Sequence, residues 1–126
     1  MKLIYPAVFH QEDNAYWVEF PDLEGCNSFG DTLEETLTNA REALEGYSIS
    51  LIEHKEKLPV PSDIGSLKSS DGFVSLVDID LSAYFNQKKA VKKTLTIPEW
   101  LNEAAIEKGI NFSQALQDAL LAKITT

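Results

Sequence analysis

A lone strand followed by two short helices constrains the fold of this chain more than any other feature. Residues 91–97 form a short run rich in β-branched side chains, and Pro98 ends it. Pro98 also suits the first turn of a helix, Lys108-Gly109 predicts its end, and Asn111 caps a second helix, with Gln114 completing the box. An unpaired strand leaves its backbone donors and acceptors without hydrogen-bond partners, and two short helices cannot bury a core of their own. The sequence therefore predicts that two copies pair these strands antiparallel about a two-fold axis, with four helices packed behind.

The first eighty-one residues predict a separate α+β unit. Strands are expected at Lys2–Phe9, Ala15–Phe20 and Cys26–Phe29, with Pro6 marking an edge position or a bulge. A fourth strand is expected at Phe73–Leu81, and its apolar beginning predicts burial on both faces. The order is β-β-β-α-β. The chain then divides into residues 1–81, a linker at 82–90 and a β-α-α module at 91–126.

One long helix connects the third and fourth strands of that unit. Thr32 and Glu35 fit a capping box at its start, and Asp31 with Glu34 fits nearly as well. Apolar residues then recur at alternating spacings of three and four, which predicts a single buried stripe: Leu33, Leu37, Ala40, Leu44, Tyr47 and Leu51.

Charge is divided unevenly between the two parts. The net charge is −9, but residues 1–81 hold five basic and sixteen acidic side chains, a balance of −11. Residues 82–126 hold six lysines and four acids, a balance of +2. Such asymmetry predicts two kinds of partner, a basic surface for the first part and phosphate for the second.

The β-α-α module contains Lys92-Lys93-Thr94-Leu95-Thr96-Ile97-Pro98, a helix, then Gly109-Ile110-Asn111-Phe112-Ser113. In the order and spacing of these parts, roughly residues 90–124 resemble the ribbon-helix-helix family of DNA-binding dimers. The resemblance implies that Leu95 and Ile97 face the dimer core, while Lys92, Thr94 and Thr96 enter the major groove of double-stranded DNA. It also implies that amides around Asn111, Phe112 and Ser113 clamp a backbone phosphate. Family ribbons commonly carry Arg, Asn or Gln among the readers, so two threonines predict weaker readout. A dimerisation tail that does not touch DNA remains the alternative.

The first fifty residues contain four motifs: Tyr5-Pro6-Ala7, the run from Tyr16 to Cys26, Gly30-Asp31-Thr32-Leu33-Glu34-Glu35 and Ala40-Arg41-Glu42-Ala43-Leu44. In these motifs the first part resembles the HicB antitoxin family. The resemblance implies a partial ribonuclease-H-like fold that binds and occludes HicA, a small basic mRNA-cleaving toxin with a catalytic histidine. A ribbon-helix-helix tail is one of the family's layouts. The expected protein is then a type II antitoxin that inhibits its toxin and represses its own operon as a homodimer on operator DNA. A higher-order complex with the toxin is compatible with this layout.

Toxin contacts are expected at Trp17, Glu19, Asp22 and Glu24, which lie within the resembling segment. Trp17 stands beside Tyr16, and we expect one of the two to be core and the other to be available as an interface anchor.

Nothing in the sequence predicts an enzyme. Two-metal hydrolysis needs converging carboxylates, but the first strand has none, and Glu19, Asp78 and Asp80 lie on other strands. His10, His54 and the single Cys26 have no companions with metal-ligand spacing, so we expect no metal and no cofactor. The chain shows no secretory signal and no membrane span, which makes the cytoplasm the default location.

Two other functions remain open at this stage. A stand-alone transcriptional regulator could use the first part to sense a small ligand. A residual nuclease could use its carboxylates.

Overall fold

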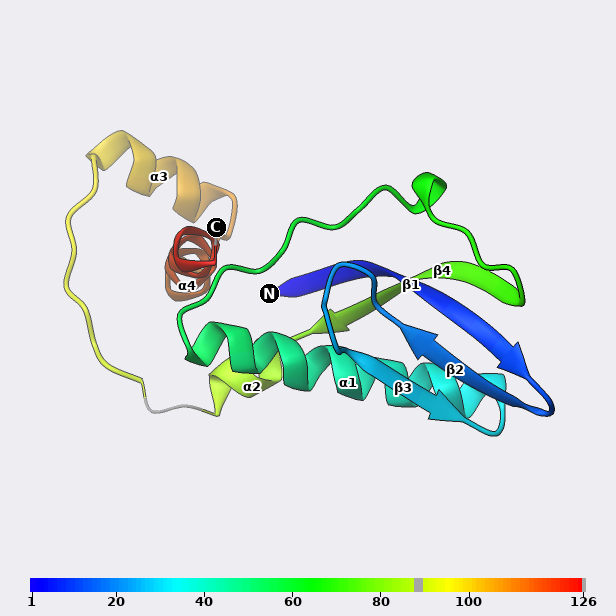
Figure 1. The fold of residues 1–126 in the computed structure, drawn as a ribbon. Coiled ribbons are helices and arrows are strands. Elements are labelled where there is room, and N and C mark those ends of the chain that lie inside the picture. The colour runs from blue at the N-terminus through cyan, green and yellow to red at the C-terminus, as the bar shows by residue number, and fades with distance from the viewer. Residues whose placement is uncertain (88–89, 126) are drawn as a thin grey trace.

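The computed structural model describes residues 1–87 and 90–125, and Figure 1 labels its elements. They are β1 (Lys2–Glu12), β2 (Ala15–Glu19), β3 (Asn27–Gly30), α1 (Leu33–Glu53), the 3₁₀ turn η1 (Ile64–Ser66), β4 (Gly72–Asp80), α2 (Ser82–Asn86), α3 (Glu99–Glu107) and α4 (Phe112–Ile124). The mixed α+β class and the β-β-β-α-β order of the first part are confirmed.

The sheet is antiparallel with strand order β3-β2-β1-β4. Beyond the two ends of the β1–β4 ladder, Leu81 donates to the Met1 carbonyl at 2.8 Å and Gln11 to the Asp71 carbonyl at 3.1 Å. Since hydrogen-bonded pairs alternate along an antiparallel ladder, odd-numbered residues of β4 face β1 with their backbone groups, and even-numbered residues face outward.

Pro6 fits this alternation although β1 is an inner strand. It pairs with Leu76 at a position where its nitrogen points away from β4. On that other side β2 reaches only as far as the pair Glu19 and Val8. Residue 6 therefore has the local edge position expected for proline, and the continuous register leaves no bulge there.

The core lies between the sheet and α1, which runs along one of its faces (Figure 1). Ala40 and Leu44 of the predicted stripe are fully buried, whereas Leu33 at the first turn is 44% exposed. Thr36 and Ser48 are also fully buried, and their small side chains let the helix lie close to the strands. A Cβ at Gly30 would lie 2.7 Å from the Thr36 nitrogen, so glycine is required where β3 meets the helix.

The start of α1 follows the first of the two capping alternatives. The Thr32 hydroxyl accepts from the Glu35 amide at 3.1 Å, and a Glu35 carboxylate oxygen accepts from the Asp31 amide at 3.4 Å. Two amide donors at the helix start are thereby satisfied. The alternative cap, Asp31 with Glu34, is not formed.

Two burial predictions for the sheet are wrong. β4 is an outer strand and is not buried on both faces, since Phe73 is 40% and Leu76 54% exposed. Neither Tyr16 nor Trp17 belongs to the buried core, because both are only partly covered. An apolar sequence is compatible with burial of both faces of a strand. Whether both faces are buried depends on whether other segments of the chain cover them.

The linker predicted at residues 82–90 is also wrong in its first half, which forms α2. Leu81 is buried, Phe85 packs against the core, and Tyr84 hydrogen-bonds Glu53 of α1. These contacts attach α2 to the first part. Lys88 and Lys89 lie outside the described residues.

The tail has its two predicted helices but no strand. Gly109 leaves α3 with φ of 68°, a value that glycine adopts without strain, and the Asn111 side chain caps α4 by accepting from the Gln114 amide at 3.1 Å. The Gln114 side chain donates to Asp118 instead of closing the box. The predicted strand, residues 91–97, is not a strand in this single chain, because no other described segment pairs with it.

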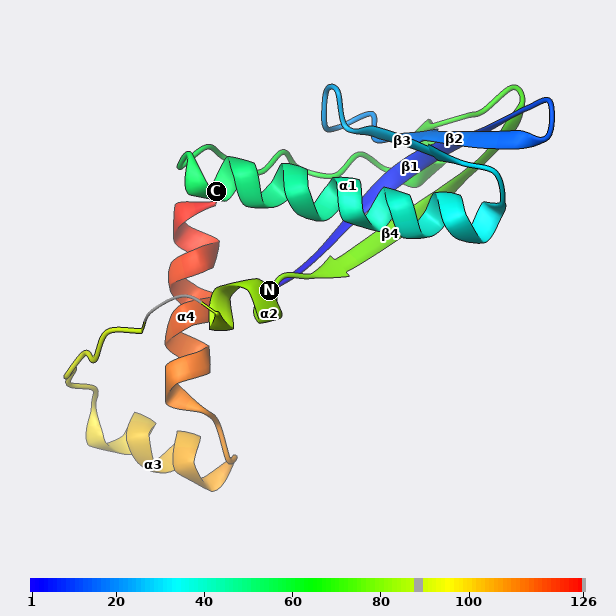
Figure 2. The ribbon, with the colours of Figure 1, turned by 90° about the horizontal axis from the view of Figure 1, so that it is seen from below.

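The tail helices lie beside the first part and off its sheet (Figure 2). α4 returns towards the end of α1, where the Leu58 amide donates to the Thr125 carbonyl at 3.2 Å. None of the described helices is long and apolar enough to span a membrane.

Candidate functional site

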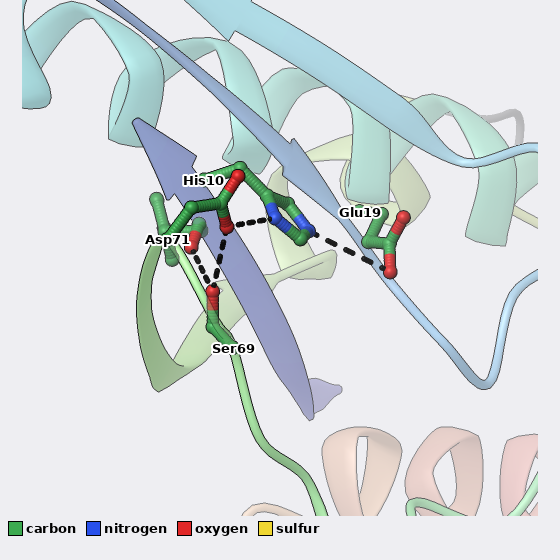
Figure 3. A network of polar contacts seen from close by, with 5 residues as sticks. His10, Glu19, Ser69 and Asp71 are labelled. Carbon is green, nitrogen blue, oxygen red and sulfur yellow. Dashed lines mark hydrogen bonds and ion pairs between the residues drawn. The ribbon is translucent and has the colours of Figure 1, made fainter. Parts of the chain in front are cut away.

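The face of the sheet opposite α1 carries a polar network centred on His10 (Figure 3). The His10 ring comes from β1, and its Nδ1 lies 2.6 Å from an Asp71 carboxylate oxygen. Its Nε2 lies 3.8 Å from the Glu19 carboxylate on β2, which is ion-pair range and not a hydrogen bond. Trp17 stacks on the same ring with centroids 3.9 Å apart and planes 11° from parallel. The register between β1 and β2 brings the two rings together, because His10 and Trp17 are cross-strand partners.

Asp71 anchors this network to the segment before β4. It accepts hydrogen bonds from His10 and from the Ser69 hydroxyl, whose contact is 3.2 Å long. The hydrogen bond from His10, followed by that from Ser69, lowers the pKa of Asp71 below its ordinary value. Ser69 also reaches the Phe9 carbonyl at 2.9 Å. The network therefore fixes the Trp17 ring on the surface.

The structure separates the four expected toxin-contact residues into two pairs. Trp17 and Glu19 lie together beside His10 on β2. Asp22 lies in the following turn, where its carboxylate accepts from both the amide and the hydroxyl of Ser62. Asp22 is thus occupied in holding the segment between α1 and β4. Glu24 is exposed at the surface of the turn.

The sequence alone missed three residues of this face. His10 and Asp71 are 61 positions apart, and no local pattern indicates their pairing. Phe29, on β3, is 76% exposed and is the cross-strand partner of Trp17. The alternation of β2 could have located Phe29 and His10, because both share the face of Trp17 once the register is known.

The Tyr5 hydroxyl adds a second anchor for the segment after α1, donating to the Pro59 carbonyl at 2.6 Å. Burial, assisted by the negative charge of Asp22, raises the pKa of Tyr5. Cys26 is buried as expected, and burial raises its pKa to about 11. A thiol with that pKa is a poor nucleophile near neutral pH.

The carboxylates considered for nuclease chemistry do not converge. Glu19 pairs with Val8, whereas Asp78 pairs with Ile4, four positions away along β1, so they lie about 13 Å apart along the strand. Asp78 pairs with Arg41 at 3.3 Å, and Asp80 accepts from the Ser82 amide at 2.9 Å. Among the described residues, no group of three or more His, Cys, Asp and Glu could hold a metal ion.

The tail residues expected to contact DNA are all exposed in the single chain. Lys92, Thr94 and Thr96 alternate along an extended segment, and Leu95 and Ile97 between them are 63% and 47% exposed. Asn111 caps α4, with Phe112 and Ser113 in its first turn. The nine residues of α3 lie between the two groups in the chain.

The described surface includes two hollows whose lining residues are known. One of about 380 Å³ lies where the N-terminus meets α4 and is lined by Met1, Lys2, Asp118, Leu121 and Ala122. The other, of about 450 Å³, is lined mainly by charged residues of α1 and β4 with Lys2. Both hollows are open to solvent and have charged side chains in their lining, whereas small-ligand sites are mostly enclosed and apolar.

Comparison with known proteins gives consistent matches. A family profile described as the HicB-like antitoxin of bacterial toxin–antitoxin systems matches residues 5–125. An uncharacterized 14.9 kDa protein of Haemophilus phage HP1 is 34% identical over 103 residues, 79% of this chain and 76% of the relative. Antitoxin HicB 1 of Photorhabdus laumondii is 37% identical over 62 residues, 48% of this chain and 40% of the relative.

Solved structures agree with these sequence matches. A chain of the toxin–antitoxin complex from Streptococcus pneumoniae is 37% identical, with a TM-score of 0.63 over 98% of this chain and 99% of that one. The Burkholderia pseudomallei antitoxin HicB is 26% identical, with a TM-score of 0.69 over 94% of this chain and 96% of that one.

Proposed function

This chain belongs to the HicB-like antitoxin family of bacterial toxin–antitoxin systems, and from that premise we propose that it binds and occludes a HicA-type mRNA-cleaving toxin and represses its own operon as a dimer on operator DNA. The family acts by binding, and the chain is not an enzyme. The observation that carries the proposal is the extent of the match, which includes both the acidic first part and the tail.

The first part supplies the toxin-binding function of the proposal. A complex of HicA3 and HicB3 is among the similar solved structures, at 27% identity over 62% of this chain. The −11 balance of residues 1–81 suits a basic toxin, which it attracts over distances of about a Debye length. We infer that this part is the partial ribonuclease-H-like fold of the family, used here as a binding scaffold. Occlusion of the toxin's histidine requires no turnover by the antitoxin.

Trp17 and Glu19 are the proposed centre of the toxin interface, with Asp22 and Glu24 at its margin. Trp17 offers a large side chain whose position is fixed by the His10 ring, and a fixed side chain loses little entropy on binding. Glu19 places a carboxylate beside it. Phe29 extends the apolar part of the same face.

The tail supplies the DNA-binding function through dimerisation. Residues 91–97 lack a partner, and the exposed apolar side chains of the tail have nothing to cover them in one chain: Val91, Leu95, Ile97, Trp100, Leu101, Ile106, Ile110, Phe112, Leu120 and Ile124. Pairing the two segments about a two-fold axis covers Leu95 and Ile97 and presents Lys92, Thr94 and Thr96 twice. A palindromic operator in the cytoplasm is the expected target, with phosphates held near Asn111, Phe112 and Ser113.

A pair of tryptophan variants tests the toxin interface. The toxin to use is the basic protein encoded beside this gene, and its affinity is measured by titration calorimetry at two salt concentrations. Trp17→Ala should weaken binding at least tenfold, whereas Trp100→Ala, which removes a 69% exposed tryptophan from the tail, should not. Added salt should weaken the wild-type complex. Equal affinities for both variants and the wild type would place the toxin on another surface.

A further inference from the structure

The two nitrogens of the His10 ring have different surroundings (Figure 3). Nδ1 lies 2.6 Å from an Asp71 carboxylate oxygen, and this hydrogen bond is the largest cause of the lowered pKa of Asp71. Asp71 is therefore ionised near neutral pH and can only accept a hydrogen bond, so Nδ1 carries the proton of the neutral ring. In that form of the ring, Nε2 has a lone pair and no proton.

Nε2 of the neutral ring is left without a donor. It is a buried atom that makes no hydrogen bond within the described part of the chain, and a Glu19 carboxylate oxygen lies 3.8 Å from it. Two acceptors thus face each other, and the buried nitrogen stays unsatisfied. A proton on Nε2 reverses this, because the ring then presents an N–H to a carboxylate at each of its nitrogens.

The other groups around His10 are also compatible with a charged ring. The Trp17 indole stacks on it with centroids 3.9 Å apart, and the face of an indole attracts a cation. Glu12, two positions along β1, shares the face of His10 and adds a carboxylate to it. β4 places the uncharged Gly72 opposite His10. Lys68, in the segment before β4, is exposed, where solvent and salt screen its charge.

Glu19 is the group that the His10 ring and a toxin would share. The Glu19 side chain is 40% exposed and that of His10 only 15%, so a partner reaches the carboxylate more readily than the ring. Under the function proposed above, on which this inference rests, the partner is a basic protein, and its lysine or arginine complements Glu19 in charge. We propose that toxin binding at Glu19 expels the Nε2 proton of His10 to solvent, so that acid weakens the complex.

Two positive charges compete for one carboxylate in this arrangement. A basic side chain of the toxin at Glu19 repels a charged His10 ring and takes over the acceptor that faces Nε2. After the proton leaves, the neutral ring keeps its hydrogen bond to Asp71 and its stacking on Trp17. Proton uptake and toxin binding oppose each other by equal amounts, as linkage requires. The toxin is therefore held more weakly as pH falls through the range in which histidines take up a proton.

Titration calorimetry of the full chain with the neighbouring basic toxin, at constant ionic strength and several pH values, tests this inference. The dissociation constant should rise about three- to tenfold between about pH 7.5 and about pH 5.5, because exchange of one proton changes it by no more than about tenfold for each pH unit. Titrations near pH 6.5 in two buffers of different ionisation enthalpy count the protons released on binding.

A pair of histidine variants assigns the released proton. His10→Asn keeps an amide donor near the position of Nδ1 but has no group that titrates in this range, so it should release fewer protons and flatten the pH dependence. His54→Asn is the matched control, since His54 is exposed at the end of α1 and contacts the Ser50 carbonyl; it should behave as the wild type. Any histidine of the toxin titrates alike in all three titrations.

The outcomes separate this inference from the function on which it rests. Equal proton release and equal pH dependence in His10→Asn and the wild type would overturn the inference and leave toxin binding standing. No complex at any pH would contradict the proposed function, and the inference with it.

Nitrogen chemical shifts of the His10 ring give a test that does not depend on a histidine variant folding. At about pH 6.5, the protonated fraction of His10 in the full chain should fall when toxin is added, while that of His54 stays the same. In the chain without toxin, Glu19→Gln should lower the same fraction, because it removes the carboxylate charge that faces Nε2. A protonated fraction of His10 that stays constant or rises on toxin binding would overturn the inference.

Discussion

Truncating Leu95 to alanine should weaken dimerisation of the chain far more than it destabilises one copy. Leu95 is 63% exposed in the single chain, so only about a third of its side chain is covered there. Full burial of a leucine side chain contributes about 1.5–3 kcal/mol. The covered third of Leu95 therefore contributes roughly 0.5–1 kcal/mol to the stability of one copy. Dimerisation through the ribbon covers the remaining two thirds.

The effect on the dimer is doubled by symmetry. Two leucines, each with about two thirds of its burial made on association, contribute roughly 2–4 kcal/mol to the dimer. Leu95→Ala should therefore raise the dimer dissociation constant about 30- to 1,000-fold, as measured by sedimentation over a dilution series.

Thr94→Ala is the control from the neighbouring position of the same segment. Thr94 faces DNA in the proposed ribbon, so its truncation should leave the dissociation constant within about twofold of the wild-type value. If Leu95→Ala and Thr94→Ala dimerise equally well, Leu95 does not lie in a dimer core and the ribbon is wrong.

Three further predictions concern DNA, acid and the helix start. Thr94→Ala and Thr96→Ala should each change the preference for operator over random DNA by about 1–3 kcal/mol in competition binding; a dimeric double variant that keeps full selectivity would refute the groove assignment. The lowered pKa of Asp71 means that its contribution to stability is complete above its unfolded pKa of about 3.9 and is lost as pH falls through the lowered value. The Tm difference between wild type and Asp71→Asn should therefore shrink on acidification below about pH 4, and a constant difference would contradict the cause given for the shift. Thr32→Ala should cost about 1 kcal/mol in denaturant unfolding, because the Glu35 amide loses its acceptor; an effect as large from Thr38→Ala would contradict the cap.

Local chemistry made the helix ends of this protein predictable. Thr32, Gly109 and Asn111 each act within a few residues of their position in the chain, and the structure places them as the sequence indicates. Composition and alternation likewise located the four strands of the first part to within a few residues at each end, whereas the strand predicted at residues 91–97 is absent from the single chain.

The sequence did not predict which residues are buried or bonded by segments far away in the chain. Whether β4 is buried depends on the number of strands beyond it, and the pairing of His10 with Asp71 depends on a register set 61 positions apart. The helix α2 was missed because its five residues are too few to show a helical period. For the candidate sites, the sequence named Trp17 and Glu19 but not the histidine between them.

Protection of RNA from the neighbouring basic toxin tests the central claim most directly. Cleavage of an RNA substrate by a fixed amount of toxin is followed while the full chain is added in increasing amounts. Cleavage should fall linearly and stop at a fixed molar ratio of chain to toxin, because occlusion consumes one binding face for each toxin. RNA cleavage that continues unchanged with the chain in excess would contradict the assignment as an antitoxin for that toxin.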